Sequence, residues 1–571
     1  MMQTIQEVAD QLPELSDPSL ASSQKNTAGA ITLATSSSLL LEACGGGAAS
    51  STSGTTPPVA AAPITDAQAS RFLAQASVGA TRTEMAKVQA SGYAAWIDAQ
   101  MAMAPSASRW SWLKTNSFDA AANIFTQNGF DSVVWYKLIT SPDTLRQRVT
   151  HALAEILVVG IDGLTATGWQ TFAAANYLDV LEANAFGNYR TLLQAVTLTS
   201  AMGQYLTYVG SAKANPKIDS HPDENYAREL MQLFTIGLLK LNPDGTPVTV
   251  NGANQETYTL TDITGLAQIF TGWDFDLSTS NTSTPDYHQR PLTQVASRHE
   301  TAASTFLGST VPAGLDGAHS LTAALDIIFA HPNVAPFVSR QLIQRLVTSN
   351  PLPAYVQRVA AVFSNDGTGV KGNLAAVVKA LLLDDEARNS ANLTNPQFGK
   401  LREPIYRFLS WARAYNVSSV GKLWTIGNTS DPASRLGQSP LRSSSVFNFF
   451  RPGYVPPNTS IANASLVAPE FQITNESTVV GYVNFMQRMI SKGNADIVPD
   501  YSTLTPLAAT PTALLAEINT VVAAGQLSDA TIAALSTAIS SMPSGTDAAT
   551  ANRIYAALTL VFAAPEYIVQ K

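Results

Sequence analysis

The sequence predicts a mainly α protein, built as one large multi-helix globular unit with long ordered loops and at most a small β-hairpin. After Thr65, most segments space their apolar residues at helical rather than alternating intervals. Hydrophobic residues make up 45% of the chain, which is enough to fill a substantial core. The stretch that favours a hairpin is 241–259, which contains the turn dipeptide Asp244-Gly245.

The helices are expected to begin directly after the N-terminal segment. Asp66 can cap a first helix that continues to Ala76, and a second covers 81–90 before the apolar stretch 93–97. Residues 144–159 place their apolar side chains on one broad face. Further helices are expected over 176–184, 188–199, 222–236, 261–270, 321–330, 334–347, 353–364, 372–383 and 401–414, with a C-terminal helical group over 511–541 and 547–563.

The rest of the chain divides into a leader and long loops. Residues 1–64 are rich in Ala, Ser, Thr and Gly, and we expect a disordered leader that combines an export signal with a tether. Residues 65–571 are expected to form the single α-helical unit, with a break between two lobes near 390–440. The segments 274–318 and 425–478 are expected to be long ordered loops, which often carry function.

Composition excludes several classes of function. The net charge is −8, whereas binding a phosphate backbone requires clustered Lys and Arg, so no nucleic-acid partner is expected. No apolar run reaches the roughly 18 residues that a membrane-spanning helix needs. One cysteine in the whole chain excludes an internal disulfide and a CxxC metal site.

Cys44 follows an apolar stretch and precedes a run of glycines, as at the site where bacterial lipoproteins are cut and acylated. This placement predicts an exported protein of the periplasm, outer membrane or cell surface, which meets a membrane surface only through a lipid anchor at Cys44. The acidic residues from Glu7 to Asp17, and Glu42 beside the cysteine, depart from an ordinary export signal. The alternative is a Ser/Ala-rich leader with an incidental cysteine.

The densest group of polar residues lies at the start of the helix expected over 222–236. The candidate catalytic residues are His221, Asp223, Glu224, Arg228 and Glu229. Ser220 or His221 is expected to cap this helix, with Pro222 at its first position. A histidine and several carboxylates at one helix start can hold a divalent cation or perform acid–base chemistry.

A divalent metal ion is the cofactor that this interpretation implies. Its candidate ligands are His221, Glu224, Glu229 and, from the long loop, His299. The alternative is an ordinary helix start, in which the acidic residues complement the positive helix end and Glu224 pairs with Arg228. Capping needs fewer carboxylates than this segment offers, so both interpretations stay open.

Other candidate groups are weaker. His151 and Glu155 stand four residues apart on the 144–159 helix, which suits a ligand pair but is more typical of a salt-bridged face together with Arg146 and Arg148. The motifs GxSxG, GxxxxGK[ST], HExxH and GxGxxG are all missing. The residues alone therefore name no reaction.

Long segments of the chain resemble a known family. They are 188–193, 222–234, 270–273, 331–333, 345–351 and 445–452. With these segments in order between residues 71 and 567, the chain resembles the large bacterial family catalogued as domain of unknown function 1800. The resemblance implies an exported protein, commonly encoded beside a partner similar to sulfatases and alkaline phosphatases. It implies no catalytic residue.

Two functions compete at this point. The first is an exported scaffold or assembly protein, lipid-anchored at Cys44, that works with a surface enzyme; low charge and long aromatic loops favour it. The alternative is a metal-assisted hydrolase that acts on a cell-surface polymer or ester.

Overall fold

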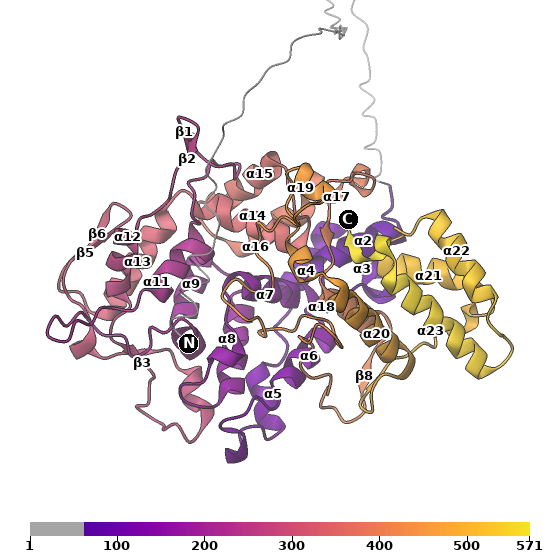
Figure 1. Ribbon diagram of the computed structural model, residues 1–571, viewed down its shortest axis with the longest axis horizontal. Helices are drawn as coiled ribbons and strands as arrows, with labels where there is room; N and C mark the ends of the chain where they lie inside the picture. The colour runs from indigo at the N-terminus through magenta and orange to yellow at the C-terminus, as the bar shows by residue number, and fades with distance from the viewer. Residues whose placement is uncertain (1–61) are drawn as a thin grey trace, which may run out of the picture. The chain divides into compact units, whose positions relative to one another are not determined.

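Helices make up most of the structure, a computed structural model that describes residues 62–571 (Figure 1). The mainly α class predicted from the sequence is confirmed. The helices of the first part are α2 (Asp66–Ala76), α3 (Arg82–Ser91), α4 (Tyr93–Ala102), α5 (Arg109–Thr115), α6 (Phe130–Thr140), α7 (Thr144–Ile156), α8 (Gln170–Ala183), α9 (Tyr189–Thr197), α10 (Ser200–Tyr205), α11 (Asn225–Glu229), which runs into the π-helix η3 (Leu230–Thr235), and α12 (Leu260–Ile269). The later helices are α13 (Gly317–Ala330), α14 (Val334–Leu346), α15 (Pro353–Ser364), α16 (Leu374–Leu383), α17 (Asp385–Arg388), α18 (Pro404–Ala414), α19 (Ser460–Asn463), α20 (Glu476–Lys492), α21 (Pro511–Ala523), α22 (Asp529–Ser540), α23 (Asp547–Ala563) and α24 (Pro565–Ile568).

The strands are short and pair only in twos within the described residues. The antiparallel pairs are β1 (Thr249–Val250) with β2 (Ala253–Asn254), β3 (Trp273–Asp274) with β4 (Thr293–Gln294), β5 (Ser304–Phe306) with β6 (Ser309–Val311), β7 (Lys400–Leu401) with β10 (Val569–Gln570), and β8 (Ser418–Ser419) with β9 (Ile497–Val498). The hairpin expected within 241–259 is β1–β2, with Thr249 opposite Asn254. The other pairs exceed the single small hairpin expected, because strands of two or three residues are too short to show an alternating pattern.

Local sequence explains where several helices begin and end. Thr65, and not Asp66, caps α2: its side chain accepts the Gln68 N–H while the Gln68 side chain accepts the Thr65 N–H. The helix expected over 511–541 is two helices, because Ala524 adopts a left-handed conformation with φ of 54° and Gly525 follows it. Helix α8 begins at Gln170, earlier than the expected residue 176.

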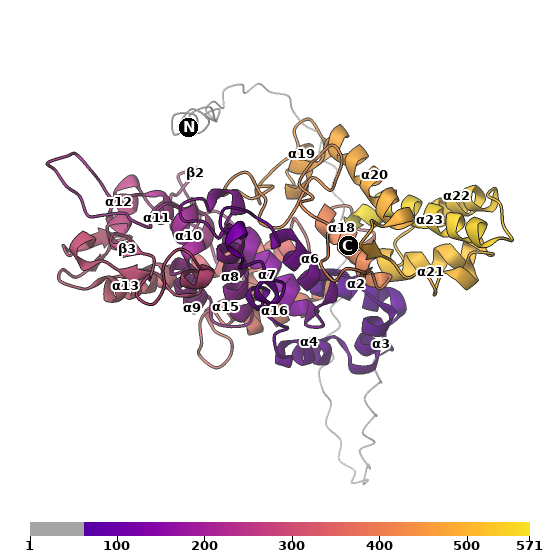
Figure 2. The ribbon, with the colours of Figure 1, turned by 90° about the horizontal axis from the view of Figure 1, so that it is seen from below.

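The centre of the unit is α7, which is buried along its whole length. It packs against α2, α4, α6, α8 and α14. In both views α11–α13 and α21–α23 lie on opposite sides of α7 and α18 (Figures 1 and 2). Because α7 carries Arg, Gln, Thr, His and Glu side chains into the core, each of these polar groups requires a partner there.

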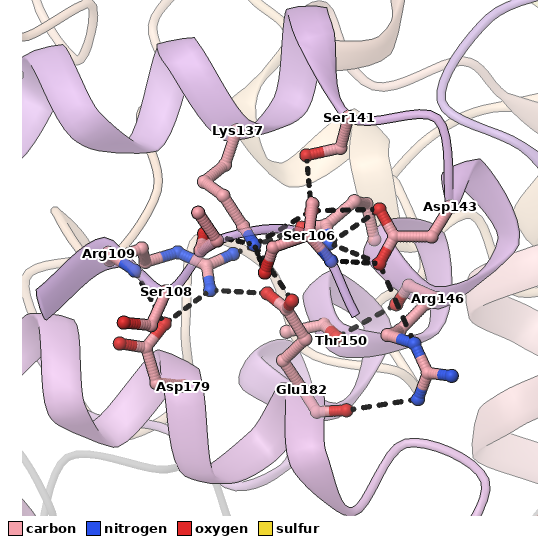
Figure 3. Close-up of polar contacts among 12 residues, drawn as sticks. Ser106, Ser108, Arg109, Lys137, Ser141, Asp143, Arg146, Thr150, Asp179 and Glu182 are labelled. Atoms are coloured by element: carbon pink, nitrogen blue, oxygen red, sulfur yellow. Dashed lines mark hydrogen bonds and ion pairs between the residues drawn. The ribbon is translucent and has the colours of Figure 1, made fainter. Parts of the chain in front are cut away.

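Beside α7, the core holds a buried ion network between α5, α6 and α8, which is drawn in Figure 3. The carboxylate of Glu182 lies 2.7 Å from Nη1 of Arg109 and 2.8 Å from Nζ of Lys137. Asp179 lies 3.1 Å from the same Arg109 nitrogen. Burial lowers the pKa of Lys137 and raises the pKa of Asp179. None of these four side chains lines the large cleft described below, so we assign the network a structural role.

Residues Ala62–Lys571 form one compact unit. The leader expected over 1–64, including Cys44, lies outside the described residues apart from 62–64. The break between lobes near 390–440 stays a prediction. No single described helix is both long and apolar enough to cross a membrane. Helices α13 and α14 are long and apolar enough only when taken together, and the chain bends by 78° between them.

Candidate functional site

The polar segment predicted to carry chemistry folds differently from the expected helix start. Glu224 is the N-cap of α11, so Pro222 lies before the helix and neither Ser220 nor His221 caps it. The reason is the local hydrogen bonding of Asp223, whose Oδ1 accepts the N–H of Asn225 at 2.9 Å. This short-range bond supplies the acceptor that the first helical N–H needs.

The four predicted metal ligands do not provide a group of three within reach of one ion. The side chain of His221 is 76% exposed, and Glu224 pairs with Arg228 at 3.3 Å. His299 is buried and its Nδ1 lies 3.0 Å from the carbonyl oxygen of Thr271. Burial raises the pKa of Glu229 to about 7. No three of these residues offer ligand atoms close enough to share an ion, so the set of His221, Glu224, Glu229 and His299 gains no geometric support.

The described residues hold one such group elsewhere, formed by His151, Glu155 and Glu403. One potential ligand atom from each side chain lies within 4.8 Å of the other two. His151 and Glu155 come from α7, and Glu403 is the residue that caps α18. All of them are buried, with Glu155 6% and Glu403 1% exposed. The face of 144–159 that carries His151 and Glu155 therefore points into the core.

Three basic side chains accompany this acidic group. Lys400 Nζ lies 3.2 Å from Oε1 of Glu403 and 3.0 Å from Oε1 of Glu470. Arg345 Nη1 lies 3.8 Å from Oε2 of Glu155. The guanidinium of Arg148 stacks 3.6 Å above the ring of Tyr406. These positive charges offset the carboxylates and make their burial tolerable.

Glu155 and Glu403 form a carboxyl pair that holds one proton. Burial raises the pKa of Glu155 far above its ordinary value, and the negative charge of Glu403 raises it further. Burial alone raises the pKa of Glu403 as well, but Lys400 and a hydrogen bond from Glu155 lower it overall. Gln438 Nε2 also donates to Oε2 of Glu403 at 2.8 Å. The proton therefore resides on Glu155, and Glu403 is ionised.

His151 completes the group as a neutral side chain. Burial lowers its pKa to about 4, with nearby cations adding to the effect. Its Nδ1 lies 2.8 Å from the hydroxyl of Tyr406, and the two rings meet edge to face. A divalent ion fits this set poorly, because Lys400 and Gln438 already bind the oxygens of Glu403 and Arg345 adds positive charge. The arrangement suits a proton better than a metal ion.

Glu155 and Arg345 also line a cleft of about 680 Å³, a volume typical of small-molecule sites. One wall comes from η3 and the chain after it, including Leu233 and Leu238. The other walls come from α14 and from the loop that contains Phe447. Nη1 of Arg345 is buried and makes no hydrogen bond among the described residues. Buried polar atoms are normally paired, so this nitrogen is suited to bind a ligand oxygen.

Comparison with known proteins bears on the same cleft. A family model described as "Protein of unknown function (DUF1800)" matches residues 71–569. The chain belongs to this family. No curated protein and no solved structure matches it. Three of the segments that carried the resemblance, 222–234, 345–351 and 445–452, contribute Gln232, Arg345 and Phe447 to the cleft. Family features that are distant in sequence therefore meet around one cavity.

The sequence offered little sign of the complete group. His151 and Glu155 were recognisable as a pair at helical spacing, but Glu403 and Lys400 come from a distant segment with no local motif. Helix α7 did carry one usable signal. It combines many polar side chains with a broad apolar face, and such a helix has to be buried with its charges paired.

Proposed function

We propose that this protein is a hydrolytic enzyme in which Glu155 acts as the general acid on a substrate bound in the cleft. The observation that carries the proposal is the place of Glu155 in the lining of a 680 Å³ cleft, where burial and the charge of Glu403 raise its pKa. A carboxyl group kept neutral by burial and by a neighbouring carboxylate is a recurrent arrangement for proton donation near neutral pH.

The chemistry that this arrangement supports is cleavage of a C–O bond. As the bond breaks, the leaving oxygen takes the proton of Glu155. A water molecule adds to the carbon and returns one proton to the Glu155 carboxylate, so that the carboxyl pair again holds one proton. Nη1 of Arg345 makes no hydrogen bond among the described residues and lies 3.8 Å from Oε2 of Glu155. It can therefore stabilise negative charge that develops on a substrate oxygen.

The surrounding residues act through Glu155. Glu403 keeps the proton on Glu155, and Lys400 keeps Glu403 ionised. We regard Glu403, Lys400 and His151 as positioning residues, because none of the three lines the large cleft. Their substitution is expected to change the pH profile of the reaction.

The test is hydrolysis of alkyl esters and alkyl glycosides, both neutral and carrying a carboxylate or sulfate group, because a basic alkoxide leaving group requires the proton of a general acid. We expect turnover by the native protein and a loss of at least about 100-fold in Glu155→Gln, the size expected when a general acid is removed. Glu517→Gln, at a partly exposed carboxylate paired with Arg82 and outside the cleft, is the matched control. Equal rates in Glu155→Gln and the native protein contradict the proposal.

Metal analysis distinguishes the metal-assisted alternative from this mechanism. Metal analysis of the purified protein, with and without Glu155→Gln and Glu403→Gln, reports whether an ion binds at the group. One equivalent of metal that is lost in both variants assigns the chemistry to an ion. An ion-free protein with turnover that depends on Glu155 assigns it to the proton.

The second candidate function is the exported scaffold, with a lipid anchor at Cys44 and a surface enzyme similar to sulfatases or alkaline phosphatases as partner. Its support is the sequence context of Cys44 and the aromatic loop 425–478. Labelling of cells with a fatty-acid analogue tests the anchor, because Cys44→Ser is expected to abolish incorporation. Cross-linking in intact cells tests the partner, and recovery of no enzyme argues against the scaffold.

A further inference from the structure

The cleft carries an unusual balance of charge. Its charged lining residues are Arg340, Arg345, Arg451 and Glu155. Glu155 is held neutral, so the lining bears three guanidinium groups and no carboxylate charge. The whole chain has a net charge of −8, and a basic cleft in an acidic protein concentrates the field on an anion that enters it.

Two of these arginines, Arg340 and Arg451, belong to no ion pair within residues 62–571. Nη1 of Arg345 lies 3.8 Å from Oε2 of Glu155, whose pKa burial raises. Arg340 makes only a long 3.4 Å contact to the carbonyl of Gly245. Arg451 stacks over the ring of Phe447 at 4.6 Å. Arg345 donates only a long hydrogen bond, 3.4 Å, to the carbonyl of Glu155 and stacks on Phe450. Three arginines that share one cavity and make few hydrogen bonds are suited to an anionic ligand.

The three arginines are arranged by depth. Arg345 is 4% exposed, Arg340 is partly buried and Arg451 is exposed. Arg345, beside Glu155, is therefore the least accessible of the three and Arg451 the most accessible. Between them lie apolar side chains, among them Leu233, Leu238 and Phe337. Such a lining matches a ligand with an uncharged body and at least one oxyanion group.

We infer that the substrate of the reaction proposed above is an anionic molecule, with a carboxylate, sulfate or phosphate group bound by Arg340 and Arg451 and an uncharged body against the apolar walls. That this molecule is a substrate rests on the proposed function, whereas its binding in the cleft does not. Planar guanidinium groups bind each of these oxyanions through paired N–H donors. With the charged group at these two more accessible arginines, the body of the ligand extends to the buried Arg345 and Glu155.

Calorimetric titration with matched probes tests this inference. The probes are 4-nitrobenzoate, 4-nitrophenyl sulfate and 4-nitrophenyl phosphate, with the neutral 4-nitrobenzamide for comparison. We expect binding of at least one anion, no binding of the amide, and an affinity that falls as salt is raised. The order of the three anions identifies the oxyanion that the cleft accepts best.

Arginine variants locate the binding. Arg340→Gln and Arg451→Gln are each expected to weaken anion binding by about tenfold or more, the loss typical of one charge-assisted hydrogen bond. Arg488→Gln is the control, because Arg488 is exposed, stacks on Phe485 and lies outside this cleft. Circular dichroism and thermal melting verify that each variant keeps its fold. Equal binding of the amide, or anion binding that ignores both substitutions, overturns the inference.

The outcomes also separate this inference from the proposed reaction. Anion binding retained in Glu155→Gln, with turnover lost, supports both. Arginine-dependent binding with turnover that does not require Glu155 supports the substrate class and contradicts the general acid. Turnover of neutral substrates alone, lost in Glu155→Gln, supports the general acid and contradicts the substrate class.

Discussion

Glu155 and Glu403 meet in the core as a carboxyl pair that shares one proton, although they come from helices that are far apart in the sequence. The asymmetry of the pair has a clear cause. Lys400 and Gln438 bind Glu403, whereas the nearest cation to Glu155 is Arg345 at 3.8 Å. The site therefore places an acid, and not a second carboxylate, at the edge of the cleft.

The ion pair between Lys400 and Glu403 is expected to be essential for folding. Lys400→Met leaves Glu403 and Glu470 as buried charges without their cation, which costs about 3–5 kcal/mol in free energy of unfolding. Urea denaturation measures this loss. In the control, Lys379→Met breaks the exposed pair with Asp98 and is expected to cost less than about 1 kcal/mol. Similar losses in both variants contradict the account.

The network of Figure 3 predicts a comparable effect at a site with no catalytic role. Glu182→Gln removes the charge that Arg109 and Lys137 share, so a net positive charge remains buried between α5, α6 and α8. We expect a loss of about 3 kcal/mol or more in the free energy of unfolding. Anion binding at the cleft, measured at a temperature where the variant is folded, is expected to be unchanged. A variant as stable as the native protein shows that Asp179 alone suffices.

Two buried histidines predict how the free energy of unfolding falls at acid pH. Burial lowers the pKa of both His151 and His288 to about 4, from an ordinary value of 6.5. In this window the unfolded chain binds protons that the folded chain does not, so stability is lost as pH falls from 6.5 to about 4. Each histidine contributes a slope of about 1.4 kcal/mol per pH unit. His288→Asn is expected to remove one such slope in urea denaturation, while His319→Asn, at an exposed histidine, is expected to leave the curve as it is.

Glu155 predicts that the free energy of unfolding falls as pH rises, the opposite of the effect of the histidines. Its pKa is raised in the folded protein, so the folded chain holds a proton that the unfolded chain releases. Stability is therefore fully present below the unfolded pKa and falls as pH rises through the folded pKa. Above pH 6.5, where the two histidines are neutral in both states, the native protein should lose stability with rising pH more steeply than Glu155→Gln. Parallel curves for the two proteins contradict the assignment of the proton.

Helices that carry one apolar stripe could be predicted from the sequence almost residue by residue. The expectations for 334–347, 353–364 and 372–383 correspond to α14, α15 and α16, because their apolar spacing follows the helical period. Helix α6 was not predicted, since it is buried on most sides and rich in β-branched and aromatic residues, which leaves no stripe and a weak helix propensity.

The candidate site was largely beyond prediction for a different reason. His151 and Glu155 share a helix, so their spacing could be read locally. Glu403, Lys400 and Arg345 reach them only through tertiary packing of α7, α14 and the start of α18, which a single sequence does not specify. The segment that drew attention instead, 222–234, supplies a wall of the cleft through Gln232 and Leu233, while His221 lies in solvent.

The protonation of Glu155 is the central claim, and infrared spectroscopy at neutral pH measures it most directly. Burial raises the pKa of other carboxyl groups too, including Glu229, so the informative quantity is the difference spectrum between the native protein and Glu155→Gln. The account predicts that this difference contains the carbonyl stretch of one protonated carboxyl at neutral pH, which is absent from the matched difference for Glu182→Gln. A difference that contains only carboxylate bands shows that Glu155 is ionised and contradicts the account.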